Sequence, residues 1–321
     1  MTSHVLSIET RALAVGQWAN LVMAVAGVSA AMLSRSDALL VDGLYSGVNF
    51  VSALIAARVA RAVRRPADSR YPFGYDAYES LYVSFRALVL IGILVFALFA
   101  SGEKILTYLS GGVVPALILG PILLYTVAMV VICGGLAWQF DRAWRRSGRC
   151  SDLLRTESRA AVVDGVLSAG AGAALLLTPL LIGTPAEGLV PIADALIVLV
   201  LQSVMLPQPL AMLRAALREV TGGAAEPESV TIARGHADEA LRGRPFTLLD
   251  VAVIKSGRTH FVVLYVKPLS PVVGETLDQL REALTVAYAS RGAAVRCEVV
   301  ATASVPFWSA QPPAVAESMS G

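Results

Sequence analysis

Residues 36–49 read SDALLVDGLYSGVN and lie inside a run that is apolar enough to span a bilayer. The run carries four polar side chains on one stripe, because a helix repeats every 3.6 residues. These residues are Asp42, Tyr45, Ser46 and Asn49. Polar groups at membrane depth are costly and usually face the interior of a helical bundle. The stretch therefore predicts a membrane helix whose polar face has a function.

The composition of the whole chain is that of a membrane protein. Of its 321 residues, 56% are hydrophobic and 16% are charged, which would give a soluble domain too much exposed apolar surface. The formal net charge is only +2 and the basic residues form no groove-sized patch, so we exclude nucleic acid as a partner. The three cysteines lack CxxC spacing, which predicts free thiols. The lipid bilayer is the expected surrounding.

Six apolar segments have the length of about 20 residues that crosses roughly 30 Å of hydrocarbon. We place them at 11–33, 37–60, 80–101, 115–138, 157–182 and 189–212. The N-terminal residues contain no short apolar region followed by a cleavage site, so we expect the first helix to be retained. Residues 1–213 are therefore predicted to form a six-helix transmembrane domain.

The arginines predict the orientation of this domain. Two of the loops between spans hold five arginines each, whereas the other connections hold one basic residue or none. The five between spans two and three are Arg58, Arg61, Arg64, Arg65 and Arg70, and the five between spans four and five are Arg142, Arg145, Arg146, Arg149 and Arg155. The positive-inside rule places such loops in the cytoplasm. With six crossings, both termini of this integral protein of the plasma or inner membrane are expected there too.

A second domain is expected over residues 214–303, where charges return and apolar residues begin to alternate. Helical spacing occurs at 228–243 and 275–290, two strands around a Ser-Gly turn at 248–268, and a third strand at 294–302. This αββαβ order suits a small α+β domain with helices on one face of a sheet. The tail, 304–321, is rich in proline and serine and is expected to be disordered.

The fifth span carries acidic residues that face the same way. Glu157 and Asp164 are seven residues apart, with Ala160 between them. An ionised carboxylate inside a bundle is costly unless it is paired, hydrated or bound to a cation, and Asp164 lies about seven residues inside its span. Spans two and five could therefore enclose a divalent cation with oxygen ligands. For the other polar residues, hydrogen bonding to neighbouring helices is an equal alternative.

Two further charges lie in or near the spans. Arg86 is about seven residues inside the third span, where it is expected to extend toward the cytoplasm or to pair with Glu157 or Asp164. Asp194 lies near the external start of the sixth span and is expected to be interfacial.

The chain resembles the cation diffusion facilitator (cation efflux) family in four features taken together. These are the loop RRPADSRYPFGYDAYES (64–80), the six spans, the polar residues on spans two and five, and the C-terminal α+β domain. The resemblance covers about residues 10–302. It implies a homodimer with a ferredoxin-like cytoplasmic domain that exports a divalent metal ion by alternating access, with protons as the counter-ion. It implies no tightly bound cofactor. An enzyme is not expected, because no nucleophile–base pair or phosphate-binding glycine loop is present.

The family's metal site has two residues four apart on span two and two residues four apart on span five. The equivalent positions here are Tyr45 and Asn49 on span two and Ala160 and Asp164 on span five. If the register slips, Asp42 and Ser46 become the span-two pair. Only Asp164 keeps a usual ligand type, and no histidine lies in a span. Such an oxygen-rich set suits manganese, magnesium or ferrous iron better than zinc.

The resemblance also assigns outer positions. Glu157 is expected at the cytoplasmic mouth of the ion pathway, and Asp68 near its access point, beside Tyr71 and Tyr75 where family members often carry histidine. In the cytoplasmic domain the family's metal positions correspond to Asp250, Tyr265, Glu298 and Val300, so this domain is expected to dimerise and not to sense metal.

A second hypothesis is kept open. Ala160 offers no ligand and Asn49 only a neutral one, so the chain could be a transport-inactive scaffold or regulatory partner built on the same fold.

Overall fold

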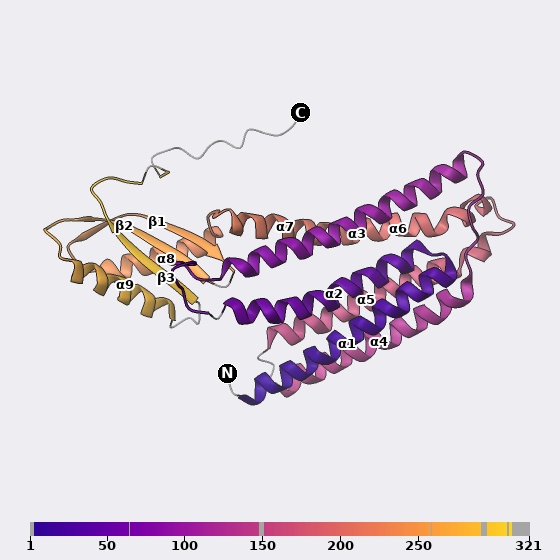
Figure 1. Ribbon diagram of the computed structural model, residues 1–321, viewed down its shortest axis with the longest axis horizontal. Coiled ribbons are helices and arrows are strands. Elements are labelled where there is room, and N and C mark those ends of the chain that lie inside the picture. The colour runs from indigo at the N-terminus through magenta and orange to yellow at the C-terminus, as the bar shows by residue number, and fades with distance from the viewer. Residues whose placement is uncertain are drawn as a thin grey trace. The chain divides into compact units, whose positions relative to one another are not determined.

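The computed structural model describes residues 3–63, 65–147, 151–257, 259–289, 294–306 and 308–309. The chain divides into two compact units (Figure 1). One contains Met1–Arg58 and Phe85–Met212, and the other contains Val59–Ser84 and Leu213–Gly321. From residue 310 onward, the tail that we predicted to be disordered lies outside the described residues.

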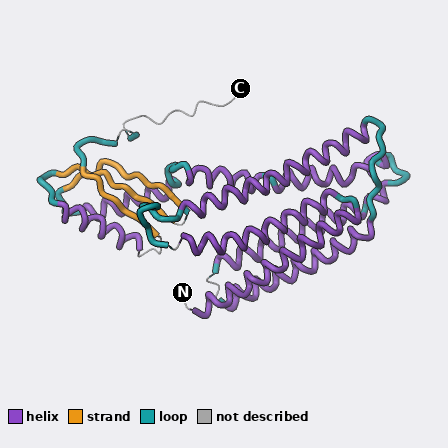
Figure 2. Tube along the Cα trace, viewed as in Figure 1, coloured by secondary structure: helices purple, strands orange, loops and turns teal. Residues whose placement is uncertain are grey.

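Long helices make up most of the chain up to Val220 (Figure 2). They are α1 (Ser3–Ser34), α2 (Asp37–Val63), α3 (Ala77–Leu109), α4 (Leu119–Arg146), α5 (Asp152–Leu176), α6 (Ala193–Met205) and α7 (Pro207–Val220), with short 3-10 helices η1 (Thr178–Leu181) and η2 (Glu187–Ile192). Six helical stretches in the described part are long and apolar enough to cross a membrane. The prediction of a six-helix membrane bundle is confirmed.

The sixth stretch, Glu187–Val220, is interrupted where α6 gives way to α7. Proline has no backbone N–H and suits the first position of a helix, so Pro207 starts α7 after α6 has ended at Met205. The helical stretch extends to Val220, eight residues past the predicted end at 212. The return of charges after residue 213 therefore marks a change of polarity and not the end of the helix.

Helices α1 and α2 cross with their backbones in contact. A Cβ atom at Gly27 would lie 2.5 Å from the Cα atom of Gly43, and one at Gly43 would lie 2.7 Å from the backbone nitrogen of Val28. Only glycine fits such a crossing, which is a common device where membrane helices approach closely. The hydroxyl oxygen of Tyr125 on α4 lies 3.0 Å from the same Cβ position of Gly27. The crossing thereby lets α4 reach the polar face of α2.

The C-terminal part has the predicted αββαβ order. Its elements are α8 (Pro227–Leu241), β1 (Phe246–Ser256), β2 (Thr259–Pro268), α9 (Gly274–Ala289) and β3 (Ala294–Ala301). The sheet order is β1-β2-β3, with β1 antiparallel to β2 and β2 parallel to β3. A parallel pair needs a crossover connection, and α9 provides it. The predicted fold class is confirmed.

The core of this domain lies between the sheet and its helices. On β2, Val262, Leu264 and Val266 are fully buried, and their spacing of two residues places them on one face of the sheet. Leu280 and Leu284 of α9 are also fully buried and belong to the same apolar cluster. The helices thus cover one face of the sheet, as the alternation in the sequence predicts.

The loop between α2 and α3 belongs to the same compact unit as this sheet. Arg296 of β3 pairs with Asp76 at 3.2 Å, and the rings of Phe73 and Phe261 meet edge to face with centroids 5.4 Å apart. The backbone N–H of Gly257, in the turn after β1, donates to the Ser80 hydroxyl at 3.1 Å. These contacts tie the loop and the start of α3 to the sheet.

Candidate functional site

A cavity lies among the membrane helices of the first unit. Its lining comes from α1, α2, α4, α5 and α6 and includes two carboxylates, Asp42 and Asp164. The other lining residues are Met23, Ala38, Leu39, Val41, Tyr45, Ser46, Asn49, Tyr125, Thr126, Met129, Leu167, Ser168, Ala171, Gly172, Leu201 and Met205. The cavity volume is about 40 Å³, and a water molecule needs roughly 10–15 Å³ by the same measure. There is room for a small ion with part of its hydration.

Of the two acids, Asp42 has the described hydrogen bonds to other helices. The Tyr125 hydroxyl of α4 donates to its Oδ2 at 2.8 Å, and the Ser168 hydroxyl of α5 donates to the same oxygen at 3.0 Å. Three helices therefore meet at one carboxylate oxygen. The two hydroxyls hold this oxygen of Asp42 in place. Its second oxygen, Oδ1, accepts no hydrogen bond among the described residues and can face a cation.

The polar stripe of α2 faces the cavity along its whole length. Asp42, Tyr45, Ser46 and Asn49 all line it. The two registers considered from the sequence therefore do not compete, because both pairs point into the same space. The helix supplies a carboxylate, a phenol, a hydroxyl and an amide to one cavity, and which of them bind an ion stays a prediction.

Asn49 has a second neighbour. The guanidinium of Arg86, on α3, donates to Asn49 Oδ1 at 3.0 Å. Arg86 Nε is buried and has no hydrogen-bond partner among the described residues. The described hydrogen bond of Arg86 thus goes to an amide of the cavity lining. The sequence offered extension toward the cytoplasm, or pairing with Glu157 or Asp164, as the alternatives. A fixed positive charge stands at the Asn49 end of the cavity.

The predicted residues of α5 are placed differently from one another. Asp164 lines the cavity, and its side chain is also partly open to the surface of the single chain. Glu157 is half-buried and Ala160 is exposed, and neither is part of the lining. Of the span-five residues singled out from the sequence, Asp164 is the one that shares the cavity with α2.

The site departs from a metal centre built of strong ligands. Within the described ranges, no three His, Cys, Asp or Glu side chains gather into a group that could hold a metal ion. Two carboxylates with neutral oxygen donors around them bind a cation more weakly than four anionic or imidazole ligands would.

Asp68 lies in the other compact unit, in the loop between α2 and α3. Its Oδ1 accepts from the backbone N–H groups of Arg70 and Tyr71, both at 2.9 Å, and its Oδ2 accepts from the Tyr75 hydroxyl at 2.7 Å. The Tyr75 hydrogen bond, followed by the backbone ones, lowers the pKa of Asp68 below its ordinary value of 3.8. The residue organises its own loop, and its predicted role at the access point stays a prediction.

Three of the four positions in the C-terminal domain that correspond to the family's metal positions have structural partners. Asp250 pairs with Arg234 at 2.6 Å, and Glu298 lies 3.8 Å from Arg281. The ring of Tyr265 packs edge to face against Trp308 with centroids 6.0 Å apart. These contacts give the side chains roles within the domain.

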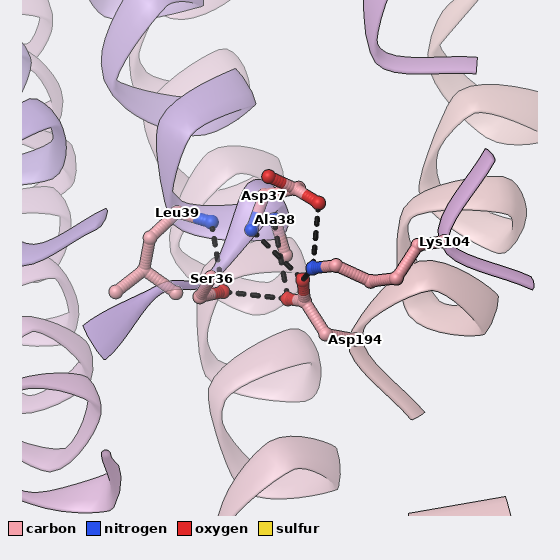
Figure 3. Close-up of polar contacts among 6 residues, drawn as sticks. All are labelled: Ser36, Asp37, Ala38, Leu39, Lys104 and Asp194. Atoms are coloured by element: carbon pink, nitrogen blue, oxygen red, sulfur yellow. Dashed lines mark hydrogen bonds and ion pairs between the residues drawn. The ribbon is translucent and has the colours of Figure 1, made fainter. Parts of the chain in front are cut away.

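A buried acid lies at the N-terminal end of α2 (Figure 3). Asp194 of α6 accepts from the Ser36 hydroxyl at 2.6 Å and from the backbone N–H of Asp37 at 2.8 Å. Lys104 of α3 pairs with Asp194 at 3.0 Å and with Asp37 at 2.7 Å. The Asp194 side chain is 1% exposed, and its expected place at the membrane interface stays a prediction. The acid is buried because it caps one helix and pairs with another.

Sequence reasoning missed the partners of Asp42. Tyr125 and Ser168 are uncharged and lie 83 and 126 residues away from it along the chain. One signal was present: Ser168 follows Asp164 by four residues and so shares its helix face.

Comparisons with known proteins agree with this architecture. Residues 13–220 match the family model of the cation efflux transmembrane domain. The metal cation efflux system protein CzcD of Cupriavidus metallidurans and the cation efflux system protein CzcD of Alcaligenes sp. are each 32% identical over 75 residues. That stretch covers 23% of this chain and 24% of each relative, about a quarter of their length. Because the family model matches well over half of the residues of this chain, the chain belongs to the cation efflux (cation diffusion facilitator) family.

Proposed function

We propose that this protein exports a divalent metal cation across the membrane through the cavity lined by Asp42 and Asp164. The observation that carries the proposal is that two acids, from α2 and α5, line one cavity among membrane helices. Two carboxylates left bare in a bundle are costly, and a divalent cation between them removes that cost. The family consists of transporters, and the CzcD relatives are named as efflux proteins, which supports the direction.

The ion is held by oxygen ligands in this proposal. Asp42 Oδ1 and the Asp164 carboxylate supply the charge, and the hydroxyls of Tyr45 and Ser46 complete the shell from α2. Asn49 binds the ion through its side-chain carbonyl only after its hydrogen bond from Arg86 has broken, because the ion and the guanidinium compete for the same oxygen, Oδ1. Manganese, iron, magnesium and zinc are the candidate ions, with the harder ones favoured by oxygen donors.

Protons are the proposed counter-ion. When the ion leaves, Asp42 and Asp164 lose their compensating charge, and each becomes neutral by taking a proton. Exchange of one divalent ion for two protons keeps the cavity neutral at both stages. Glu157, on α5, is proposed to lie at the cytoplasmic mouth, with both termini in the cytoplasm and the protein working as a homodimer through its C-terminal domain.

The test is transport in liposomes that contain the purified full-length protein and a pH-sensitive dye. We expect divalent-ion-stimulated proton flux in the wild type and its loss in Asp42→Asn and Asp164→Asn. Asp141→Asn is the matched control, because Asp141 forms an exposed pair with Arg145 away from the cavity. Full flux in both cavity variants would overturn the proposal.

One observation favours a second candidate. Arg86 already holds Asn49, and Ala160 offers no ligand, so the cavity could have lost its ion and the protein could act as a scaffold. Calorimetry on the purified protein separates the two functions. Absence of binding for every divalent ion at millimolar concentration, together with absence of flux, would leave the scaffold function.

A further inference from the structure

A second cavity, the turn pocket, lies where α1 turns into α2. Its walls come from the end of α1, the start of α2, the end of α3 and the loop after α3, represented by Met32, Asp37, Lys104 and Pro115. Its volume is about 310 Å³, against about 40 Å³ for the cavity proposed to hold the metal ion. This is the size of a small-molecule pocket, roughly 300–1,000 Å³, and not of a single ion. Within the described residues, the linings of the two cavities have no member in common.

Arg35 holds the turn in a strained backbone conformation. It follows Ser34, the last residue of α1, and its φ of 62° lies in the left-handed region. Glycine is the usual residue at such a helix end, because a side chain is disfavoured there. No other non-glycine residue in the described part of the chain has a positive φ. Since glycine would make the same turn without strain, the guanidinium itself is what this position retains.

The charges of the turn pocket form two poles. Arg35 lines the pocket, and its guanidinium has no ion pair among the described residues. Lys104 also lines the pocket, but it serves two acids, Asp37 at 2.7 Å and Asp194 at 3.0 Å. Lys104 contacts Oδ2 of Asp37, and Oδ1 has no described partner (Figure 3). The pocket is therefore neutral as a whole, with a positive pole at Arg35 and a negative pole at Asp37.

Apolar side chains complete the wall of the turn pocket. Met32, Leu40 and Pro115 belong to it. Met32 is 78% exposed in the single chain, as is 64% of its neighbour Leu33, and both lie in the last turn of a membrane helix. The end of a membrane helix lies at the level of the lipid head groups, and apolar side chains one turn deeper meet the acyl chains. Two charged poles beside an apolar wall at this level fit an amphiphile.

We propose that the turn pocket binds the head group of phosphatidylethanolamine from the surrounding bilayer. Arg35 donates to the phosphate, because a guanidinium can give two parallel hydrogen bonds to phosphate oxygens. Oδ1 of Asp37 accepts from the ammonium group, and an acyl chain lies along Met32. Phosphatidylcholine has no N–H to donate to Asp37, and phosphatidylglycerol has no positive charge for it. The lipid site goes beyond the proposed transport and does not depend on it.

The test follows the thermal unfolding midpoint of purified, delipidated full-length protein in detergent. Dioleoyl-phosphatidylethanolamine, dioleoyl-phosphatidylcholine or dioleoyl-phosphatidylglycerol is added at equal concentration, and a lipid that binds the folded protein raises the midpoint. For the wild type we expect the largest rise with phosphatidylethanolamine.

Arg35→Gly separates the lipid site from a role in the turn. It relieves the left-handed strain, so the midpoint without lipid should equal or exceed that of the wild type. The extra rise with phosphatidylethanolamine should nevertheless be lost, down to the rise seen with phosphatidylcholine. Asp37→Asn should lose the same extra rise, and Lys104 keeps Asp194 as its partner in this variant. Arg58→Gln is the control, because this exposed arginine lies at the opposite end of α2.

Four outcomes would overturn the lipid site. The first two are an equal rise with all three lipids in the wild type, and an extra rise with phosphatidylethanolamine that survives in Arg35→Gly. A larger rise with phosphatidylglycerol would show attraction of anionic lipid alone, and an equal rise with soluble phosphoethanolamine would assign the pocket to a free phosphate ester. The ion-stimulated proton flux of the wild type tests the proposed transport separately, so either proposal can fail without the other.

Discussion

The Asp194 carboxylate of α6 caps the N-terminus of α2, accepting a hydrogen bond from the backbone N–H of Asp37 at 2.8 Å. The first N–H groups of a helix have no partner within it and carry partial positive charge, so an acid from another helix stabilises them. Lys104 neutralises the same acid from α3 (Figure 3). A single side chain thus joins the ends of three membrane helices.

Replacing Asp194 should therefore destabilise the membrane domain. Asp194→Ala leaves Lys104 and the end of α2 without their common partner, and removing one member of a buried pair costs about 3–5 kcal/mol. Thermal unfolding in detergent, followed by tryptophan fluorescence, should show a clearly lower midpoint. Asp141→Ala serves as the control, because an exposed pair is worth about 0.2–1 kcal/mol. Equal midpoints for the two variants would contradict the capping role.

The crossing of α1 and α2 predicts a steric effect. Gly27→Ala puts a methyl group 2.5 Å from Gly43 Cα, so the helices must separate, and overpacking of this kind costs roughly 1–3 kcal/mol. Separation also moves Tyr125 away from Asp42, so ion binding should weaken together with stability. Gly47→Ala, on the same face region of α2, meets Ala24 at an ordinary 3.6 Å and should behave as wild type. The comparison is made by the unfolding midpoint and by calorimetry.

The sequence predicted those features that depend on local periodicity. Six apolar stretches, the αββαβ order and the placing of Asp42, Tyr45, Ser46 and Asn49 on one stripe follow from repeats of 3.6 and 2 residues, which tertiary context rarely overrides over such lengths. The polar stripe was informative because four costly side chains share one face of an apolar helix.

The partners across the bundle were not predictable in the same way. The contact of Cys133 with Met23 joins residues 110 positions apart, and that of Ser36 with Asp194 joins residues 158 apart. Such pairs depend on how each helix is rotated about its axis, which hydropathy does not encode. Asp194 is an example: the sequence places it near a helix end, whereas its burial by the end of a neighbouring helix was not predictable.

The two hydroxyl groups that donate to Asp42 are predicted to strengthen ion binding. Tyr125→Phe and Ser168→Ala each remove one donor to Oδ2, and a hydrogen bond to a charged group contributes about 1.5–3 kcal/mol. The carboxylate is then less well held in position, so we expect divalent-ion affinity to fall by roughly tenfold or more in each variant. Ser203→Ala is the matched control, because its hydroxyl donates to the carbonyl of Leu199 within α6. Unchanged affinity in both cavity variants would remove Asp42 from the ion site.

Asp68, in the loop between α2 and α3, predicts a pH effect on stability. The Tyr75 hydroxyl lowers the pKa of Asp68 below 3.8, so the folded loop favours the ionised acid. The stabilisation is present above the ordinary pKa, near pH 4 and higher, and is lost as the pH falls through the lowered folded value. NMR titration of the Asp68 carboxyl carbon should give a pKa below 3.8 that returns toward it in Tyr75→Phe. Tyr71→Phe is the control, because the Tyr71 hydroxyl bonds Tyr78 and its backbone N–H remains on Asp68; an equal pKa rise in both variants would show that the loop as a whole, and not the Tyr75 hydroxyl, sets the value.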